Sequence, residues 1–348
     1  MMYGFLKNFI FRFDPEFDHR IAEFLLKNVV PLPLISDCVA SQCCFFDESL
    51  RSEVLGLRFA NPVGLSAGFD KNATMLKGLS TLGFGFAEVG SVTLQAQEGN
   101  PKPRIFRFAD EESLQNSMGF NNDGAEVMMQ RLKALRPFVL PLGVNLGKNK
   151  DAQDALSNFE QNLDKLQEVG DFFIFNLSSP NTPNLRDLQN EDFVAELFAM
   201  ACAKTNKPLL LKICPDNEIT HSLKVVEQAI KSGASGIVAT NTTKDYSLLK
   251  APKESGGVSG KALRNKSREV FYELAKAFFG KTTLIASGGI FDGEEAYDRI
   301  KMGASLVEVY SALIFEGPSV CARINQEILR RLKKDGFSNI SEAVGVDL

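Results

Sequence analysis

Short clusters of small and neutral polar residues recur along the chain, each directly after an apolar run. The longest, NLSSPNTPNL (176–185), holds three Asn, two Ser, one Thr and two Pro, and carries no charge. The others are SAGFDKN, GSVT, NLGKN, KICPD, TNTT, SGG and YS. One such cluster alone is a turn, but eight of them after eight apolar runs predict a shared site. Amides and hydroxyls both donate and accept hydrogen bonds, which suits a planar heterocycle with alternating carbonyl and N–H groups.

Glycines and lysines in these clusters add anion chemistry. The stretches SGGI (287–290) and GGVSG (256–260) expose backbone N–H groups that could hold a phosphate. Lys71 and Lys212 stand at the ends of apolar runs. Each could form a Schiff base, face an anionic ligand or extend to solvent. No GxxxxGK[ST] sequence occurs, which argues against a nucleotide triphosphatase.

The elements that position these clusters are predicted to be strands and helices that alternate regularly along the chain. Near-continuous apolar runs predict eight strands buried on both faces, at 62–68, 86–90, 140–147, 172–178, 208–213, 236–241, 283–289 and 305–311. Helical patterns lie at 123–135, 152–168, 193–205, 219–232, 266–279, 293–302 and 318–334. Eight β/α units predict an α/β fold, a closed (β/α)8 TIM barrel, over an open doubly wound sheet, whose GxGxxG fingerprint is missing. In a barrel the polar clusters converge at the carboxyl ends of the strands.

The first 50 residues have a different pattern. Aromatic residues recur every four positions, at Phe5, Phe9, Phe13 and Phe17. Pro15 predicts two short helices, the second over about 15–29 with Asp14 as its N-cap, and the prolines of VVPLPLI (29–35) predict an end to helical structure there. The apolar stripe either packs on the main domain or lies in a membrane interface. In the second case four basic residues would lie near the lipid head groups, namely Lys7, Arg12, Arg20 and Lys27.

Composition narrows the function classes. The net charge is −4 and no long basic block occurs, which argues against a nucleic-acid partner. Six cysteines without a CxxC pair and only two histidines predict no disulfide framework and no metal site. No signal peptide is visible, and no apolar run reaches the roughly 20 residues that span a bilayer. A length of 348 residues fits a helical segment over 1–48 and a barrel over 49–348.

A series of ordered motifs resembles dihydroorotate dehydrogenase over about residues 50–335. They are GLSAGFDKN, EVGSVT…GNPKPR, NSMGFNN, GVNLGKNK, NLSSPNTPNLR, LLLKICPD, VATNTT, GGVSG, LIASGGI and GASLVEVYS. The resemblance is to class 2, the quinone-dependent, membrane-associated form. It implies an FMN-containing barrel that oxidises (S)-dihydroorotate to orotate in pyrimidine (UMP) biosynthesis, with a membrane quinone as acceptor. It further implies a monomer bound peripherally, through its N-terminal helices, to the cytoplasmic face of the inner membrane.

The resemblance also implies roles for individual residues. Ser179 matches the catalytic base, and Lys212 would stabilise negative charge on the reduced flavin. The positions that match the flavin site are Ala67, Gly68, Lys71, Ser91, Asn145, Asn176, Lys212, Thr240, Gly260, Gly289, Tyr310 and Ser311. Those that match the substrate site are Lys71, Asn116, Ser117, Met118, Gly119, Phe120, Asn176, Asn181, Asn241 and Thr242. The quinone tunnel would include His19, Arg107 and Tyr310. At Ser117 the family often has a bulky or basic residue, so only the backbone is expected to contribute there.

Other functions are compatible with parts of this pattern. Class 1 enzymes resemble this chain but use a cysteine base and lack the N-terminal helices, whereas here the base position is Ser179 and Cys214 follows another strand. The closest alternative is another FMN barrel oxidoreductase, such as a class 1 type enzyme with a soluble acceptor or a dihydrouridine synthase. A barrel that only binds a nucleotide, or a membrane-attached scaffold, is the non-enzymatic alternative.

Overall fold

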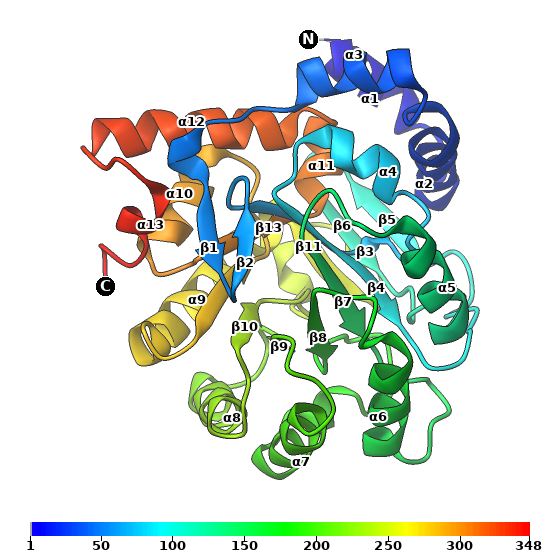
Figure 1. Cartoon of the computed structure of the whole chain (residues 1–348). Helices are drawn as coiled ribbons and strands as arrows, with labels where there is room; N and C mark the ends of the chain where they lie inside the picture. The colour runs from blue at the N-terminus through cyan, green and yellow to red at the C-terminus, as the bar shows by residue number, and fades with distance from the viewer. Residues whose placement is uncertain (1) are drawn as a thin grey trace.

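Eight parallel strands close into a barrel at the centre of the molecule (Figure 1). This computed structural model describes residues 2–348, with only the backbone of Met2 and Phe5. The barrel strands are β3 (Val63–Asp70), β4 (Phe86–Val92), β7 (Leu142–Leu146), β8 (Phe172–Asn176), β9 (Leu209–Ile213), β10 (Gly236–Ala239), β12 (Thr283–Ser287) and β13 (Leu306–Val309). Their order around the barrel follows the chain, with β13 pairing back to β3. Each predicted strand overlaps one of them, which confirms the TIM barrel and rules out the open sheet.

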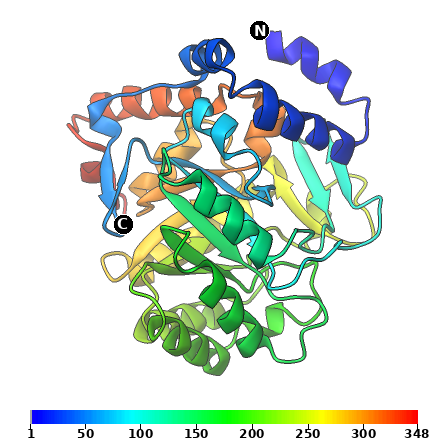
Figure 2. The ribbon, with the colours of Figure 1, turned by 45° about the vertical axis from the view of Figure 1, so that its right-hand side comes forward.

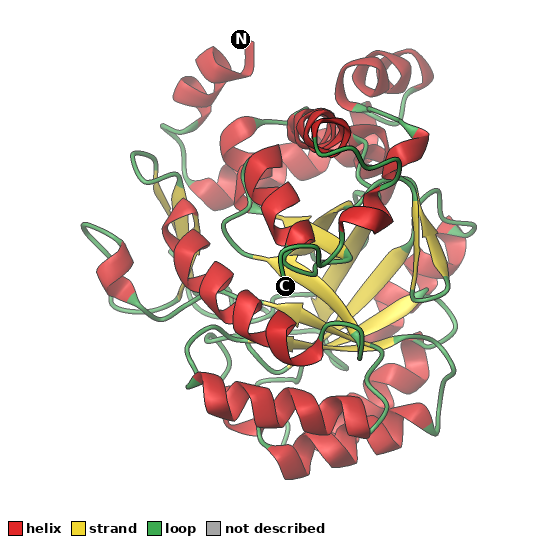
Figure 3. Ribbon diagram, turned by 90° about the vertical axis from the view of Figure 1, so that its left-hand side faces the viewer, coloured by secondary structure: helices red, strands yellow, loops and turns green. Residues whose placement is uncertain are grey.

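Helices surround the barrel, as Figure 3 shows. The predicted ones are α5 (Ala125–Leu135), α6 (Ala155–Leu166), α7 (Glu191–Cys202), α8 (Ile219–Lys231), α9 (Arg264–Phe278), α10 (Gly293–Lys301) and α12 (Val320–Lys334). Three short helices were not predicted, α4 (Leu76–Leu79), α11 (Ser311–Glu316) and α13 (Ile340–Ala343). The seven predicted helices pack around the outside of the barrel strands, which explains why the strands are unbroken apolar runs in the sequence.

Aromatic and aliphatic side chains fill the barrel interior near the amino ends of the strands. Phe86 and Phe172 meet there, with Phe59 from a short hairpin beneath them. The hairpin is formed by β1 (Ser52–Val54) and β2 (Leu57–Phe59). Gly64 leaves space for this packing, because a Cβ at its position would lie 2.3 Å from the Phe86 ring. The apolar layer closes this end, so a ligand site must lie at the carboxyl ends.

A small antiparallel sheet fills the long interval between the second and third barrel strands. It consists of β5 (Ile105–Phe108), β6 (Ser113–Asn116) and the distant β11 (Gly257–Gly260), in the order β11-β6-β5. The sequence predicted only the helix at 123–135 in this interval. The sheet was missed because its strands are four residues each and one partner comes from more than 130 positions later.

The N-terminal segment forms three helical parts on the side of the molecule away from α6, α7 and α8 (Figures 1 and 2). They are α1 (Met2–Ile10), α2 (Pro15–Phe24), extended by a π-helical turn over Leu25–Val29, and α3 (Pro33–Cys43). The Asp14 carboxylate accepts the backbone N–H groups of Glu16 and Phe17, which confirms the predicted N-cap. We expected VVPLPLI to end helical structure, but Pro33 begins α3, because proline is tolerated in a first helical turn.

The aromatic stripe of α1 and α2 faces outward. Phe9 is 57% exposed and Phe24 60%, with Phe13 and Phe17 also exposed. The interpretation that this stripe packs on the barrel is therefore wrong for Phe9, Phe13 and Phe17; the side chain of Phe5 lies outside the described residues. Within residues 2–348 no single helix is long and apolar enough to span a membrane. The helix pair 15–29 and 33–43, bent by 118°, meets that criterion only when combined.

Candidate active site

A single cavity of about 570 Å³ connects the N-terminal helices with the carboxyl ends of the barrel strands. Its outer part is lined by apolar residues of the helical segment, such as Leu6, Ala22 and Val39. Its inner part is lined by the polar clusters, including Asn176, Thr240 and Gly289. The predicted convergence is therefore observed for seven of the eight clusters, since no residue of NLGKN lines the cavity, and the cavity has an apolar and a polar end.

Asparagine side chains form the wall of the polar end. Asn241 Nδ2 donates to Asn176 Oδ1 at 3.2 Å and to Ser178 Oγ at 2.9 Å. Across the cavity, Asn181 Nδ2 donates to the backbone carbonyl of Asn116 at 3.1 Å and to its side-chain oxygen at 3.2 Å. These contacts fix the amide groups in a neutral surface that can both donate to and accept from a heterocycle.

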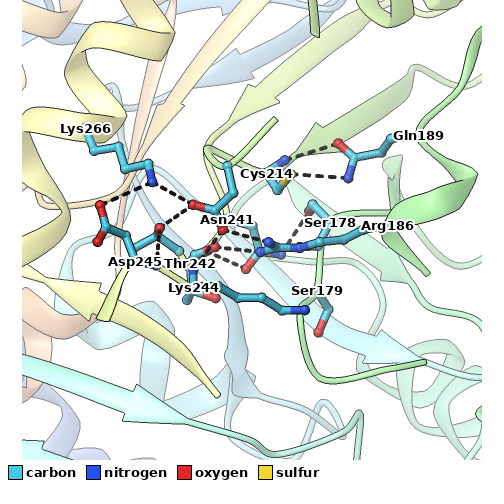
Figure 4. A network of polar contacts seen from close by, with 12 residues as sticks. Ser178, Ser179, Arg186, Gln189, Cys214, Asn241, Thr242, Lys244, Asp245 and Lys266 are labelled. Carbon is cyan, nitrogen blue, oxygen red and sulfur yellow. Dashed lines mark hydrogen bonds and ion pairs between the residues drawn. The ribbon is translucent and has the colours of Figure 1, made fainter. Parts of the chain in front are cut away.

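Ser179 lies in the loop after β8, 6% exposed, and lines the cavity. Its Oγ accepts the backbone N–H of Asn181 at 3.3 Å. Arg186, later in the same loop, donates through Nε to the carbonyl of Ser178 and through Nη2 to that of Thr242, both at 2.9 Å (Figure 4). Its Nη1 is 2.7 Å from Asp216. Arg186 therefore ties the Ser179 loop to the loops after β9 and β10.

Cys214 is separate from this group. Its thiol accepts Gln189 Nε2 at 3.4 Å, and Figure 4 shows the two residues paired. It is buried and does not line the cavity. The expectation that this cysteine lies outside the site is thus met, and Ser179 remains the candidate base.

Two lysines face the cavity with different charge environments. Burial lowers the pKa of Lys71 to about 8, although Glu16 and Asp70 oppose this shift. Lys212 Nζ lies 3.2 Å from Glu88 Oε2 and 3.0 Å from Glu308 Oε2. Burial would lower its pKa, but these two carboxylates raise it above the ordinary value. Lys212 is thus a fixed cation, whereas Lys71 can lose its charge near physiological pH.

Three glycines form a cradle in the wall at the polar end of the cavity. Gly260, Gly288 and Gly289 have φ values of 99°, 101° and 74°, a backbone region that residues other than glycine rarely adopt. A Cβ on Gly289 would also lie 2.4 Å from Arg264 Cα. The hydroxyl-bearing Ser311 lines the same region. Close backbone and hydroxyl groups of this kind can hold a phosphate.

An aromatic row connects the polar part of the cavity with the N-terminal helices. The His19 ring packs edge-on at 5.3 Å from Phe69, which lies 6.1 Å from Tyr310. Burial lowers the pKa of His19 to about 3, with a smaller contribution from Lys71, so the imidazole is neutral. Arg107 donates through Nη2 to Asp18 at 2.7 Å. Its Nε and Nη1 are buried without a protein partner among the described residues, so they remain available to a ligand.

All residues that the sequence assigned to the site line this cavity except Asn145 and Ser117. Asn145 lies behind the wall, where its Nδ2 donates to Glu88 at 3.0 Å. Ser117 engages the neighbouring loop through its backbone. Sequence reasoning missed Ser66, Phe69, Glu88, Arg186 and Glu308. The sequence did contain a sign that Glu88 and Glu308 are unusual, because each stands inside an otherwise apolar run, FAEVG or SLVEVYS.

Fold and site together define a (β/α)8 barrel with a cavity that is polar at the carboxyl ends of the strands and apolar toward the helical segment. The family model of dihydroorotate dehydrogenase matches residues 49–332, and the chain belongs to that family. It is 51% identical to the dihydroorotate dehydrogenase (quinone) of Helicobacter acinonychis and 48% identical to that of Nitratiruptor sp., in both cases over 100% of each chain. The structure is similar to that of an Eimeria tenella DHODH in complex with ferulenol, with a TM-score of 0.86, 35% identity and 96% of each chain covered. The predicted family and its quinone-dependent class are confirmed.

Proposed function

We propose that this protein oxidises (S)-dihydroorotate to orotate, a step of pyrimidine (UMP) biosynthesis, with FMN as cofactor and a membrane quinone as electron acceptor. The observation that carries the proposal is the single cavity with a neutral amide wall and Lys71 at one end and apolar helices at the other. The amide wall suits a pyrimidine and the apolar end suits a quinone. Family membership supports the same reaction.

The residues of the inner cavity fit FMN. The glycine cradle and Ser311 suit its phosphate, and the buried Thr240 Oγ1, which has no protein partner among the described residues, is a free polar contact for its ring. We assign to FMN the residues Ala67, Gly68, Lys71, Ser91, Asn176, Lys212, Thr240, Gly260, Gly289, Tyr310 and Ser311, with Asn145 acting from behind the wall through its contact with Asn176. When bound, FMN accepts the hydride from dihydroorotate and passes the electrons on to the quinone. The Lys212 ammonium would stabilise negative charge on the reduced flavin.

Asparagines and Lys71 position the substrate. The assigned residues are Lys71, Asn116, Met118, Gly119, Phe120, Asn176, Asn181, Asn241 and Thr242, with Ser117 supporting its neighbours through its backbone only. The Lys71 ammonium would pair with the carboxylate of dihydroorotate, and the amides would bond to its carbonyl and N–H groups. The loop 176–185 has no charged residue, so nothing in it repels that carboxylate. Fixed orientation of the substrate supplies a large part of the rate.

Ser179 would take the proton from the carbon next to the substrate carbonyl. An alcohol is a weak base unless it is activated. Ser179 must therefore give up its own hydroxyl proton, to a water or a neighbouring hydroxyl, as it takes the proton from the substrate. The Asn181 N–H that donates to Ser179 Oγ would stabilise the alkoxide character of that oxygen. Pro180 and Pro183 restrict the backbone around this group.

The N-terminal segment, residues 1–48, would bind the membrane surface and admit the quinone to the catalytic domain, residues 49–348. Its exposed Phe9, Phe13, Phe17 and Phe24 form an apolar surface of the kind that enters a lipid interface. His19, Arg107 and Tyr310 would line the quinone path, with Arg107 Nε and Nη1 as donors for a quinone carbonyl. We propose a monomer bound peripherally to the cytoplasmic face of the inner membrane.

Anaerobic titration with dihydroorotate tests this function. The purified protein should carry flavin absorbance, which dihydroorotate should bleach while one orotate forms per flavin. A protein purified without flavin, or a flavin that dihydroorotate leaves oxidised while dithionite reduces it, would exclude the proposal.

A further inference from the structure

Three charged side chains from three barrel strands meet beside the cavity. Glu88 on β4, Lys212 on β9 and Glu308 on β13 are at most 4% exposed. The Lys212 ammonium donates to both glutamates and to Ser66 Oγ at 3.1 Å. All three of its protons are therefore used within the protein.

The charge of this group does not balance when every member is ionised. Two carboxylates and one ammonium leave a net charge of −1, and burial of an uncompensated charge is costly. In addition, Glu88 Oε1 and Glu308 Oε1 are both buried without a hydrogen-bond partner among the described residues. One proton added to the pair removes the excess charge and supplies a donor for these oxygens.

The environment decides which carboxyl carries that proton. Burial and the neighbouring Glu308 raise the pKa of Glu88 well above its ordinary value. Burial also acts to raise the pKa of Glu308, but Lys212 and hydrogen bonds outweigh it and hold this pKa below its ordinary value. The balanced state is therefore neutral Glu88, ionised Glu308 and cationic Lys212.

Contacts connect this group to the cavity wall. Asn145 Nδ2 donates to Glu88 Oε2 at 3.0 Å, and Asn145 Oδ1 accepts Asn176 Nδ2 at 3.1 Å and the hydroxyl of Ser91. Ser66, Lys212 and Glu308 line the cavity directly, in the part that the proposed function assigns to the flavin.

We propose that Glu88 and Glu308 share one proton and act as positioning residues, which hold Lys212 in place and balance its charge toward the bound flavin. The inference rests on the proposed function, since it assumes a flavin next to Lys212. Reduction adds negative charge to the cavity, so the net charge of the group sets how easily the flavin is reduced. Loss of either glutamate alone leaves one carboxylate to balance Lys212, whereas loss of both leaves the Lys212 charge unbalanced.

Matched amide variants test this difference. The double variant Glu88→Gln/Glu308→Gln removes the charge that balances Lys212, so it should favour the reduced flavin by tenfold or more, a rise in midpoint potential of about 30 mV or more for a two-electron couple. Each single amide variant keeps one carboxylate beside Lys212 and should shift the potential by much less. All three potentials are measured by dye equilibration on the flavin-loaded full chain. A shift in either single variant as large as in the double variant, or no shift in the double variant, would overturn the proposal.

Infrared spectroscopy of the unmodified protein gives a second readout that needs no variant to fold. Near pH 8 exposed carboxyl groups are ionised, so the shared proton predicts a carbonyl stretch of a neutral carboxylic acid that persists there and shifts in D2O. Absence of that band would refute the shared proton. If the protein lacks flavin absorbance, the proposed function fails, while the band still reports on the glutamate pair.

Discussion

The charge of Lys71 predicts a specific alkaline loss of substrate binding. Its pKa of about 8 means that the ammonium is present below this pH and is lost as the pH rises through it. At pH 9 about one in eleven molecules keeps the cation, so kcat/KM for dihydroorotate should fall about tenfold per pH unit above 8. The substrate carboxylate restores the cation in the complex, because an opposite charge raises the pKa of Lys71. KM should therefore rise before kcat falls.

Three other groups at the cavity, Lys212, Tyr310 and His19, do not titrate in this window. Lys212 has a raised pKa, and burial raises that of Tyr310 to about 12, whereas His19 is already neutral. The assay is steady-state orotate formation between pH 6 and 10 at saturating quinone. In Lys71→Arg the cation persists, so the alkaline limb should disappear even if the plateau is lower. The exposed Lys244→Gln variant is the matched control and should keep the limb. A flat wild-type profile up to pH 10, or the same limb in Lys71→Arg, would refute the reasoning.

Three further variants test separate parts of the structure. Ser179→Ala should lower kcat by about 10²–10⁴ with little change in KM, and near wild-type turnover would exclude Ser179 as the base. Arg186→Met removes one of the two cations beside Asp216, which keeps Lys266, and leaves the carbonyls of Ser178 and Thr242 without their donor, so it should reduce the free energy of unfolding by about 2 kcal/mol and raise KM; an unchanged denaturant midpoint would contradict the role of Arg186 in tying the loops. The double variant Phe9→Ser/Phe24→Ser should weaken sedimentation with lipid vesicles roughly tenfold or more, whereas equal sedimentation would place the membrane contact elsewhere.

Local sequence patterns predicted the barrel because its strands are short apolar runs bounded by turn residues. Long amphipathic helices such as α8 and α12 were equally clear. Elements that depend on distant partners were missed, as β11 shows, since it pairs with β6 from another part of the chain. Helix α3 was missed because prolines were interpreted as a break, although Pro33 occupies a first helical turn.

The same distinction holds for the site. Strand ends predicted the wall residues, since parallel strands of a barrel bring their carboxyl ends together. Glu88 and Glu308 lie inside strands, and only closure of the barrel brings both to Lys212. The position of a residue within a motif also does not show whether its side chain lines the cavity or lies behind the lining. Asn145 illustrates this, because it contacts Glu88 and lies outside the cavity lining.

Re-oxidation of the reduced protein tests the central claim most directly. The protein is reduced with dihydroorotate under anaerobic conditions and then mixed separately with a short-chain quinone, fumarate or NAD, while flavin absorbance is followed. The apolar end of the cavity, with its buried Arg107 donors, predicts rapid recovery of the oxidised spectrum with the quinone alone. Recovery with fumarate or NAD at the rate seen with the quinone, or no recovery with the quinone, would contradict the account.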